Sequence, residues 1–313
     1  MNDVGAVPTP QVLHAGPFAL PLQRPLVMGI VNITPDSFSD GGRFLSPQRA
    51  IEHARRLAEE GADLLDLGAE STRPGAQPVS ADEELARLLP VIDGLRDLGR
   101  PISVDTMKPA VMRAAVAAGA AMINDVRALR EPGALDAAAA SRAAVCLMHM
   151  QGEPRTMQAH PRYENVVREV RHFLLERAGA CIRAGIARER IVIDPGFGFG
   201  KTVLHNMQLL AALERLAAEG FAVLAGFSRK SSLGRITGRA EGERMPASLA
   251  AALIAVQRGA RILRVHDVAE TRDVLAVWEA VRQAESGDCA TGAEPAAPAG
   301  AAPAARGTGA EMR

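Results

Sequence analysis

Eight short apolar segments of this chain end in, or are closely followed by, a polar or ionisable side chain. In chain order these side chains are Asn32, Asp66, Asp105, Asn124, His149, Asp194, Ser228 with Lys230, and Arg264 with His266. A single Asp or Asn after an apolar segment is most often a cap on the following helix. Capping does not explain Lys, Arg and His at equivalent positions, so the pattern favours one polar site to which all eight segments contribute.

The residue types in this set suit a flat heterocycle that carries an anionic group. Carboxylate and amide side chains can hydrogen-bond the edge of an amide-like ring, as in carboxylate–amidine pairing. Arg264, His266 and Arg73 supply positive charge for a phosphate-like group. Asn32 offers a neutral oxygen, which suits a single protein ligand to Mg²⁺ that phosphates already hold. No group of His and Cys residues indicates a tightly held transition metal.

Residues 194–202, with the sequence DPGFGFGKT, join a carboxylate to a loop that contains three glycines. Glycines leave little side-chain bulk, so a flat ligand or a phosphate can approach the backbone closely. The ending Gly-Lys-Thr suggests a phosphate-binding P-loop, but the pattern G-x-x-x-x-G-K-[ST] requires Gly where Pro195 stands. We therefore favour another use of this loop.

The elements that would position these residues alternate regularly along the chain. Apolar runs predict strands at about 26–30, 64–67, 102–104, 121–123, 144–148, 191–193, 222–225 and 261–265. Helical patterns follow them at about 47–60, 81–98, 109–118, 133–140, 165–184, 205–218, 246–258 and 269–285. Ser80 is the expected N-cap of the second helix, and Glu83 would complete a capping box.

Eight strand–helix units predict an α/β protein, a closed (β/α)8 TIM barrel that forms a single domain. Short strands that are apolar on both faces suit a parallel sheet. An open, doubly wound sheet is the alternative, because periodicity does not show closure. We expect residues 25–285 to form the barrel, residues 1–24 to form an N-terminal extension or plug, and the Ala/Pro-rich tail 286–313 to be disordered.

Composition predicts a soluble cytoplasmic protein. The 36 basic and 36 acidic residues of the 313-residue chain balance, so no overall field favours nucleic acid or a membrane as a partner. The three cysteines have no paired spacing, which argues for a reducing compartment and against a disulfide framework or a zinc site. No apolar run reaches the ~18 residues of a membrane span, and residues 1–20 lack the features of a signal peptide.

Motifs at the predicted strand ends resemble those of the bacterial dihydropteroate synthases, a family of pterin-binding TIM barrels. The two longest are MGIVNITPDSFSDGG at 28–42 and DLGAESTRPG at 66–75. Six more follow in order: SVDT at 103–106, IND at 123–125, LMHMQG at 147–152, DPGFGFGK at 194–201, GFSRKS at 226–231 and RVHDV at 264–268. The resemblance covers about residues 25–284, and its specificity comes from the eight collinear motifs together.

Members of this family join 6-hydroxymethyl-7,8-dihydropterin diphosphate to 4-aminobenzoate, which yields 7,8-dihydropteroate and pyrophosphate. The resemblance implies that Asp194 accepts hydrogen bonds from the 2-amino and ring N–H groups of the pterin. Asn124 and Asp105 would complete the hydrogen-bonded edge, and Lys230 would donate to the ring carbonyl and N5. Met148 and Phe199 would wall the ring, although a role in the core suits Met148 equally well.

The resemblance also implies how the leaving group is handled. Asn32 would bind Mg²⁺ together with the diphosphate, whose oxygens Arg264 and His266 would hold. If C–O cleavage runs ahead of attack, Asp105, with Asp36 when its loop closes, would stabilise positive charge on the pterin methylene. The implied catalytic residues are Asp105, Lys230, Arg264, His266 and Asp36.

Two loops, 34–42 and 71–75, read as surface linkers by composition but close over the substrates in the family. Thr72 and Arg73 would then lie near 4-aminobenzoate, and Ser231 with the start of the helix after it would bind the carboxylate. The resemblance further implies a homodimer and a sulfonamide target. Two rival functions are a barrel that transfers a methyl group from a methylated folate to a corrinoid partner, and a non-catalytic pterin sensor.

Overall fold

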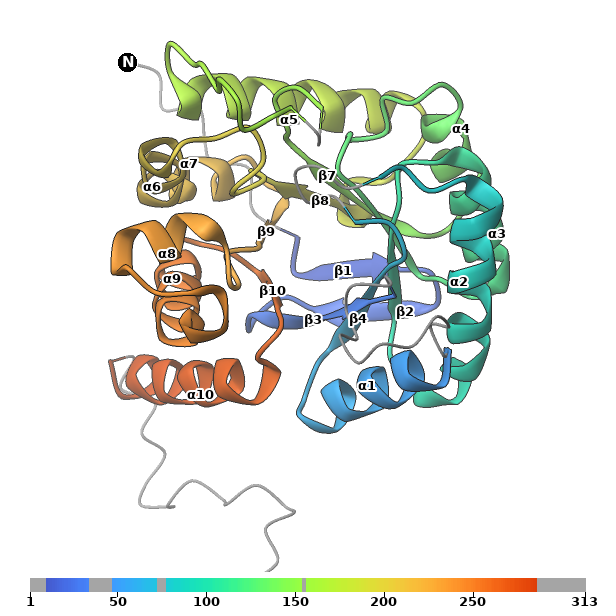
Figure 1. Cartoon of the computed structure of the whole chain (residues 1–313), viewed down its shortest axis with the longest axis horizontal. Coiled ribbons are helices and arrows are strands. Elements are labelled where there is room, and N and C mark those ends of the chain that lie inside the picture. The colour runs from blue at the N-terminus through green and yellow to red at the C-terminus, as the bar shows by residue number, and fades with distance from the viewer. Residues whose placement is uncertain (1–9, 34–46, 72–76, 154–155, 286–313) are drawn as a thin grey trace, which may run out of the picture. The chain divides into compact units, whose positions relative to one another are not determined.

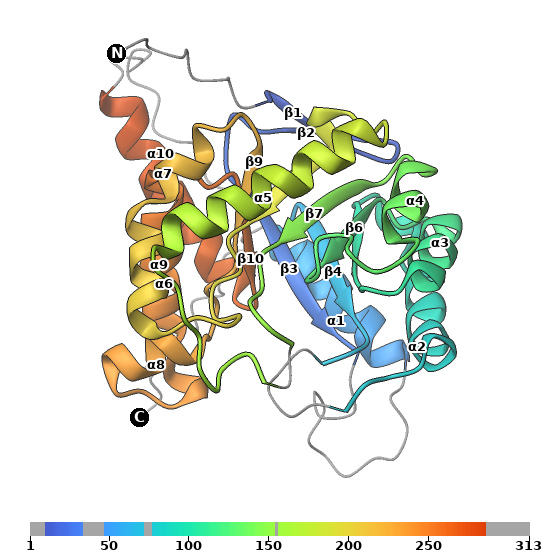
Figure 2. The same ribbon diagram turned by 90° about the horizontal axis from the view of Figure 1, so that it is seen from above.

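The computed structural model describes residues 10–33, 47–71, 77–153 and 156–285. Its centre is a closed barrel of parallel strands (Figures 1 and 2). The strands are β3 (Leu26–Asn32), β4 (Leu64–Gly68), β5 (Ile102–Asp105), β6 (Met122–Asp125), β7 (Ala144–Met148), β8 (Ile191–Asp194), β9 (Ala222–Ala225) and β10 (Ile262–Val265). They follow one another in chain order, and β10 pairs with β3 to close the ring. The predicted (β/α)8 barrel is confirmed and the open sheet is excluded.

Helices alternate with the strands along the chain (Figure 1). They are α1 (Pro47–Glu59), α2 (Ala81–Gly94), α3 (Pro109–Ala118), α4 (Ala134–Ala139), α5 (Val166–Arg183), α6 (Val203–Ala211), α7 (Leu213–Ala217), α8 (Ser231–Thr237), α9 (Met245–Gln257) and α10 (Val268–Glu285). The strands lie in the first of two compact units, residues 1–275, and the second unit begins within α10. None of the described helices is long and apolar enough to cross a membrane.

Two local predictions were wrong, and one helix was missed. The expected helix 205–218 is divided at Ala212, whose φ of −106° and ψ of 15° are not helical, into α6 and α7. Helix α8 was not predicted, because its seven residues contain Gly234 and show no sustained apolar period. The capping box at α2 is half formed: Ser80 Oγ accepts the Glu83 N–H at 3.1 Å, but the Glu83 carboxylate pairs with Arg87 instead.

A β-hairpin covers the end of the barrel at which the strands begin (Figure 2). It consists of β1 (Val12–Ala15) and β2 (Phe18–Pro21), which pair antiparallel. Leu13, Ala15 and Leu22 pack against barrel residues such as Met28. A fully buried leucine such as Leu13 contributes about 1.5–3 kcal/mol. Because this end is filled with apolar side chains, the opposite end, where the strands terminate, is the one that can hold a polar site; we call it the C-terminal mouth.

Candidate active site

The pairing of the strands places three predicted site residues, Asn32, Asp105 and Asn124, at one level of the C-terminal mouth. Asn32 is in register with Gly68, Gly68 with Asp105, and Asp105 with Asn124. Residues in register on neighbouring parallel strands point to the same face of a sheet. Gly68 leaves room between its neighbours, since a Cβ there would lie 3.9 Å from Asn32 Oδ1 and 3.8 Å from Asp105 Cβ.

Arg264 lies between two carboxylates at this mouth. Its Nε donates to Asp66 Oδ2 at 2.6 Å and its Nη2 donates to Asp105 Oδ2 at 3.2 Å. Asn124 Nδ2 donates to the same Asp66 oxygen at 3.1 Å. The side chains of Arg264 and Asp105 keep 20% and 15% of their surface exposed, whereas that of Asp66 is fully buried. Asp66 therefore supports the guanidinium from within the barrel, and Asp105 meets it where a ligand can reach both.

Two carboxyl groups of the mouth, those of Asp105 and Asp194, have unusual proton affinities. Burial raises the pKa of Asp105 to about 7, although the Arg264 guanidinium acts in the opposite direction. Burial likewise raises the pKa of Asp194 to about 6, against the hydrogen bond that Asp194 Oδ1 accepts from the Gly196 N–H at 2.7 Å. Strongly perturbed carboxyl groups in a polar mouth are typical of binding and catalytic sites.

Lys201 organises the glycine loop from inside. Its buried ammonium donates to the carbonyl oxygens of Gly196 and Phe199, both at 3.0 Å, and to His149 Nδ1 at 2.9 Å. Burial lowers the pKa of Lys201 to about 7 and that of His149 to about 2. Because the ammonium binds the backbone of its own loop, the structure supports the rejection of a P-loop, in which the lysine binds phosphate.

The glycines of this loop permit its close packing on the β7 end. Gly196 has a φ of +66°, and a Cβ there would lie 2.0 Å from the His149 carbonyl oxygen. Gly200 has a φ of +61°, and a Cβ there would lie 2.4 Å from the Gln151 carbonyl oxygen. Any other residue would push the loop, and with it Phe199, away from the barrel.

The side chain of Phe199, which belongs to the glycine loop, contacts that of Lys230. The Lys230 ammonium lies 4.2 Å from the centroid of the Phe199 ring, a cation–π contact. Phe199 also packs against a cluster of Val126, Met148, Met150 and Met157. Met148 is only 5% exposed. It belongs to this buried cluster as well as to the predicted ligand site.

His266 is held by Ser228 and is neutral. Ser228 Oγ lies 2.9 Å from the ring nitrogen Nδ1 of His266. The same hydroxyl oxygen accepts a hydrogen bond from the backbone N–H of His266 at 3.1 Å. Burial, with the nearby Arg264 charge, lowers the pKa of His266 to about 3. The positive charge that sequence analysis assigned to this histidine is therefore absent at neutral pH in the substrate-free protein, where His266 is a neutral hydrogen-bonding group.

Ser231 begins α8 and lies at a separate part of the mouth. It borders a cleft of about 210 Å³, which is also lined by Gln158, Gly198, Lys201, Val203, Asn206, Ser232 and Arg235. Asn206 fixes the cleft wall, because its Oδ1 accepts the Gly198 N–H at 2.8 Å and its Nδ2 donates to the Thr202 carbonyl at 2.9 Å.

An ion-pair group that sequence analysis did not identify lies among the described residues before and after positions 72–76. Lys108 Nζ donates to Glu70 Oε2 at 2.5 Å and to Glu84 Oε2 at 2.6 Å. Glu70 Oε1 accepts the Val79 N–H at 3.1 Å. The Glu84 side chain is fully buried. These contacts tie the residues before and after 72–76 to the connection between β5 and α3.

Most predicted site residues thus come together at the C-terminal mouth, and the outcome for the others differs. Outside the described residues lie Asp36, Thr72 and Arg73. Asp66 was recognised at a strand end but left out of the predicted site. The sequence could have indicated its role, because Asp66 is the one charged residue in the apolar strand LLDLG.

Comparisons with known proteins identify the family. A family model described as "Pterin binding enzyme" matches residues 28–266. A dihydropteroate synthase of Haemophilus influenzae is 51% identical over 273 residues, which make up 87% of this chain and 99% of that protein.

Two solved structures extend the similarity to three dimensions. A Xanthomonas albilineans dihydropteroate synthase with 4-aminobenzoic acid is 58% identical, with a TM-score of 0.83 and coverage of 88% of this chain and 99% of that one. A Yersinia pestis dihydropteroate synthase in complex with a sulfonamide drug is 47% identical, also with a TM-score of 0.83, and the coverage is 87% and 99%. The chain therefore belongs to the dihydropteroate synthase family of pterin-binding enzymes.

Proposed function

We propose that this chain condenses 6-hydroxymethyl-7,8-dihydropterin diphosphate with 4-aminobenzoate to give 7,8-dihydropteroate and pyrophosphate. The observation that carries the proposal is the pairing of Arg264 with Asp66 and Asp105 at the mouth of the barrel. One guanidinium is thereby placed for an anionic leaving group beside a carboxylate placed for a developing positive charge. The similarity to named dihydropteroate synthases supports the same reaction and does not favour methyl transfer to a corrinoid.

The pterin ring is recognised by the carboxylate and amide groups of the mouth. Asp194 is held in one orientation by the Gly196 N–H, and its carboxylate accepts hydrogen bonds from the pterin's 2-amino and ring N–H groups. Asn124 and Asp105, in register on adjacent strands, complete this edge. Lys230, placed over Phe199, donates to the ring carbonyl and N5.

Leaving-group stabilisation is usually the largest catalytic contribution. Arg264 neutralises charge on the diphosphate, and its own position is fixed by Asp66 from inside the barrel. His266 contributes a neutral hydrogen bond, because burial keeps its pKa near 3. As the C–O bond lengthens, positive charge on the pterin methylene is stabilised by ionised Asp105. The amine of 4-aminobenzoate then attacks the methylene carbon and loses a proton.

The donor set at the mouth fits a magnesium ion that the diphosphate brings with it. Asn32 provides one amide oxygen, and no group of three or more His, Cys, Asp or Glu residues in the described part of the chain could hold a metal by itself. Mg²⁺ typically takes one or two protein ligands and completes its shell with phosphate oxygens and water. When bound, the ion would neutralise charge on the departing pyrophosphate.

The 4-aminobenzoate site is assigned to Ser231 and the cleft that it borders. The carboxylate of 4-aminobenzoate would accept a hydrogen bond from the Ser231 hydroxyl, and Thr72 and Arg73 would approach the substrate from the loop 71–75. The complex of the X. albilineans relative with 4-aminobenzoic acid supports this substrate. The homodimer and the cytoplasmic location stay predictions; two described cysteines, Cys146 and Cys181, are free thiols, which suits a reducing compartment.

Pyrophosphate release from the purified protein tests the proposal. The pterin diphosphate, 4-aminobenzoate and Mg²⁺ are supplied together and then omitted one at a time. Release is expected only when all three are present, and a sulfonamide is expected to compete with 4-aminobenzoate. Release without 4-aminobenzoate at the full rate would indicate a hydrolase, and binding of the pterin without any release would indicate a sensor.

A further inference from the structure

Arg229 lies between two residues of the site, Ser228 and Lys230, and has a backbone conformation that residues with a Cβ rarely adopt. Its φ is +57°, in the left-handed region. Such a conformation costs free energy and persists only where the surrounding structure holds it. Because no turn-forming glycine stands at this position, other groups must provide the restraint.

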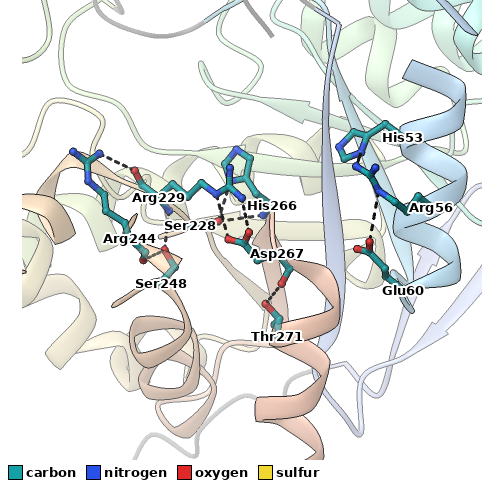
Figure 3. A network of polar contacts seen from close by, with 10 residues as sticks. All are labelled: His53, Arg56, Glu60, Ser228, Arg229, Arg244, Ser248, His266, Asp267 and Thr271. Atoms are coloured by element: carbon teal, nitrogen blue, oxygen red, sulfur yellow. Dashed lines mark hydrogen bonds and ion pairs between the residues drawn. The ribbon is translucent and has the colours of Figure 1, made fainter. Parts of the chain in front are cut away.

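Both backbone polar groups of Arg229 are bound by side chains from the start of α9 and the residue before it. The Arg229 N–H donates to Ser248 Oγ at 2.9 Å, and Ser248 Oγ donates in turn to the Arg244 carbonyl oxygen at 2.8 Å. The Arg229 carbonyl oxygen accepts from Arg244 Nη1 at 3.1 Å. Figure 3 shows Ser248 and Arg244 on one side of Arg229.

The side chain of Arg229 is fixed from another direction. Its Nη2 lies 2.5 Å from Asp267 Oδ1 and its Nε lies 3.3 Å from Asp267 Oδ2, a two-point contact (Figure 3). Asp267 follows His266 directly, and its carbonyl oxygen accepts from Thr271 Oγ1 at 2.6 Å. The residue between Ser228 and Lys230 is therefore anchored to α9 and to the start of α10 at the same time.

Helix α8 is shaped to let Arg244 reach this position. A Cβ at Gly234 would lie 2.4 Å from Arg244 Nε and 2.8 Å from the Arg239 carbonyl oxygen. Glycine is unfavourable inside a helix, and α8 has only seven residues. Its presence is explained by the path of the Arg244 side chain across α8.

The conformation of Arg229 determines the direction of the next residue. Lys230 has a φ of −61° and a ψ of 145°, is the N-cap of α8, and extends its ammonium to 4.2 Å from the Phe199 centroid. A right-handed Arg229 would rotate the following peptide and redirect both Lys230 and Ser231. A misplacement of about 1 Å in a reacting group is enough to reduce rates about a hundredfold.

We infer that Ser248 and Arg244 are positioning residues, which hold Arg229 in the left-handed conformation and so direct Lys230 and Ser231 into the site. Neither touches the reacting atoms. The inference rests on the proposed function for its kinetic readout, but the backbone conformation that it predicts can be measured without substrate.

Two kinetic comparisons and one crystal structure test the inference. Ser248→Ala should lower kcat/KM for the pterin diphosphate about tenfold, within the range that misplacement produces. The same change made in an Arg229→Gly background should lower kcat/KM by less than about twofold, because glycine adopts the left-handed conformation without a restraint. A crystal structure of the substrate-free Ser248→Ala variant should show residue 229 outside the left-handed region or in two conformations.

Thr237→Val is the matched control. Thr237 Oγ1 donates to the Leu233 carbonyl oxygen at 2.9 Å, four residues earlier, as Ser248 does to Arg244, but it makes no contact with Arg229 in the described structure. Its kcat/KM should stay within about twofold of that of the unaltered protein. An equal loss from Ser248→Ala in both backgrounds, or an unchanged left-handed residue 229 in its crystal structure, would overturn the inference. Absence of turnover in the unaltered protein would reject the proposed function and leave the crystallographic test standing.

Discussion

The two ends of the barrel differ although the same strands build both. At the end where the strands begin, Leu64, Met122 and Ile262 point inward and pack against the N-terminal hairpin. Two residues further along each of these strands stand Asp66, Asn124 and Arg264, which form the hydrogen-bonded centre of the mouth. The side-chain period of a strand is two residues, so each strand changes from apolar to polar along the inner face within one period.

This difference separates stability from chemistry. Apolar burial at the hairpin end contributes stability at roughly 25 cal/mol per Å² of apolar surface. At the C-terminal mouth, buried carboxyl groups are held near a guanidinium and keep raised pKa values, as Asp105 and Asp194 do, which costs stability in the substrate-free protein. Substitutions at the mouth should therefore affect turnover, and substitutions at the hairpin end should affect the free energy of unfolding.

The largest expected effect is that of Asp105→Asn on turnover. The amide keeps the shape but cannot stabilise positive charge on the pterin methylene, so kcat should fall about a hundredfold or more. The pterin Kd, measured by calorimetry, should change by less than about tenfold, because one hydrogen bond to the ring is altered. Asp97→Asn on the surface is the control. Equal losses in kcat and binding would reject the role of Asp105 as a charge stabiliser.

Leu13→Ala should produce the converse result. Leu13 lies in the hairpin that covers the barrel and is only 1% exposed to solvent. Truncation of a buried leucine costs about 2–5 kcal/mol of unfolding free energy. The kcat/KM measured well below the melting temperature should be unchanged. Leu204→Ala, at a position that is 64% exposed, serves as the matched control. A large loss of kcat/KM in the folded Leu13→Ala protein would contradict the separation of the two ends.

Asp194→Asn should stabilise the substrate-free protein at pH 8 while it weakens pterin binding. The folded pKa of Asp194 is about 6, above the ordinary 3.8, so its contribution to stability is present below pH 3.8 and is lost as the pH rises through 6. Removal of the carboxyl group should therefore increase the unfolding free energy at pH 8 by on the order of 2 kcal/mol. Denaturant unfolding at pH 4 and pH 8 measures this, and a gain of the same size at both pH values would refute the linkage.

The smallest expected effect lies at neither end. Asn165 caps α5 by accepting the Arg168 N–H at 3.0 Å, and its replacement by alanine should cost about 1 kcal/mol of stability. Thermal unfolding and steady-state kinetics of Asn165→Ala should show a small decrease in Tm and an unchanged kcat/KM. A decrease in kcat/KM would mean that helices outside the barrel also set the site geometry.

Residue types and period predicted the parts of the molecule that depend on local pattern. The strand-end positions of Asn32, Asp105 and Asn124 follow from apolar runs that stop at a polar residue, and their register follows from closure of the barrel. Most strand and helix positions were recovered for the same reason. Exceptions such as α8 and the break at Ala212 have short or weak periods that give no signal.

Contacts between distant parts of the chain could not be predicted in this way. The sequence argued against a phosphate-binding role for the Gly-Lys-Thr motif but did not indicate what Lys201 binds, because its carbonyl partners are created by the fold of its own loop against β7. His266 was assigned a positive charge by residue type, whereas burial keeps it neutral. The contacts that restrain Arg229 join residues up to 38 positions apart. No local sequence pattern predicts a left-handed backbone conformation at a residue other than glycine.

A crystal structure with the pterin diphosphate and Mg²⁺ bound tests the central claim most directly. The account predicts the pterin ring at the C-terminal mouth, with its amino and ring N–H groups on Asp194, its edge on Asn124 and Asp105, and the diphosphate beside Arg264 with the ion near Asn32. Density for the pterin in any other part of the molecule, or a diphosphate that does not approach Arg264, would contradict it.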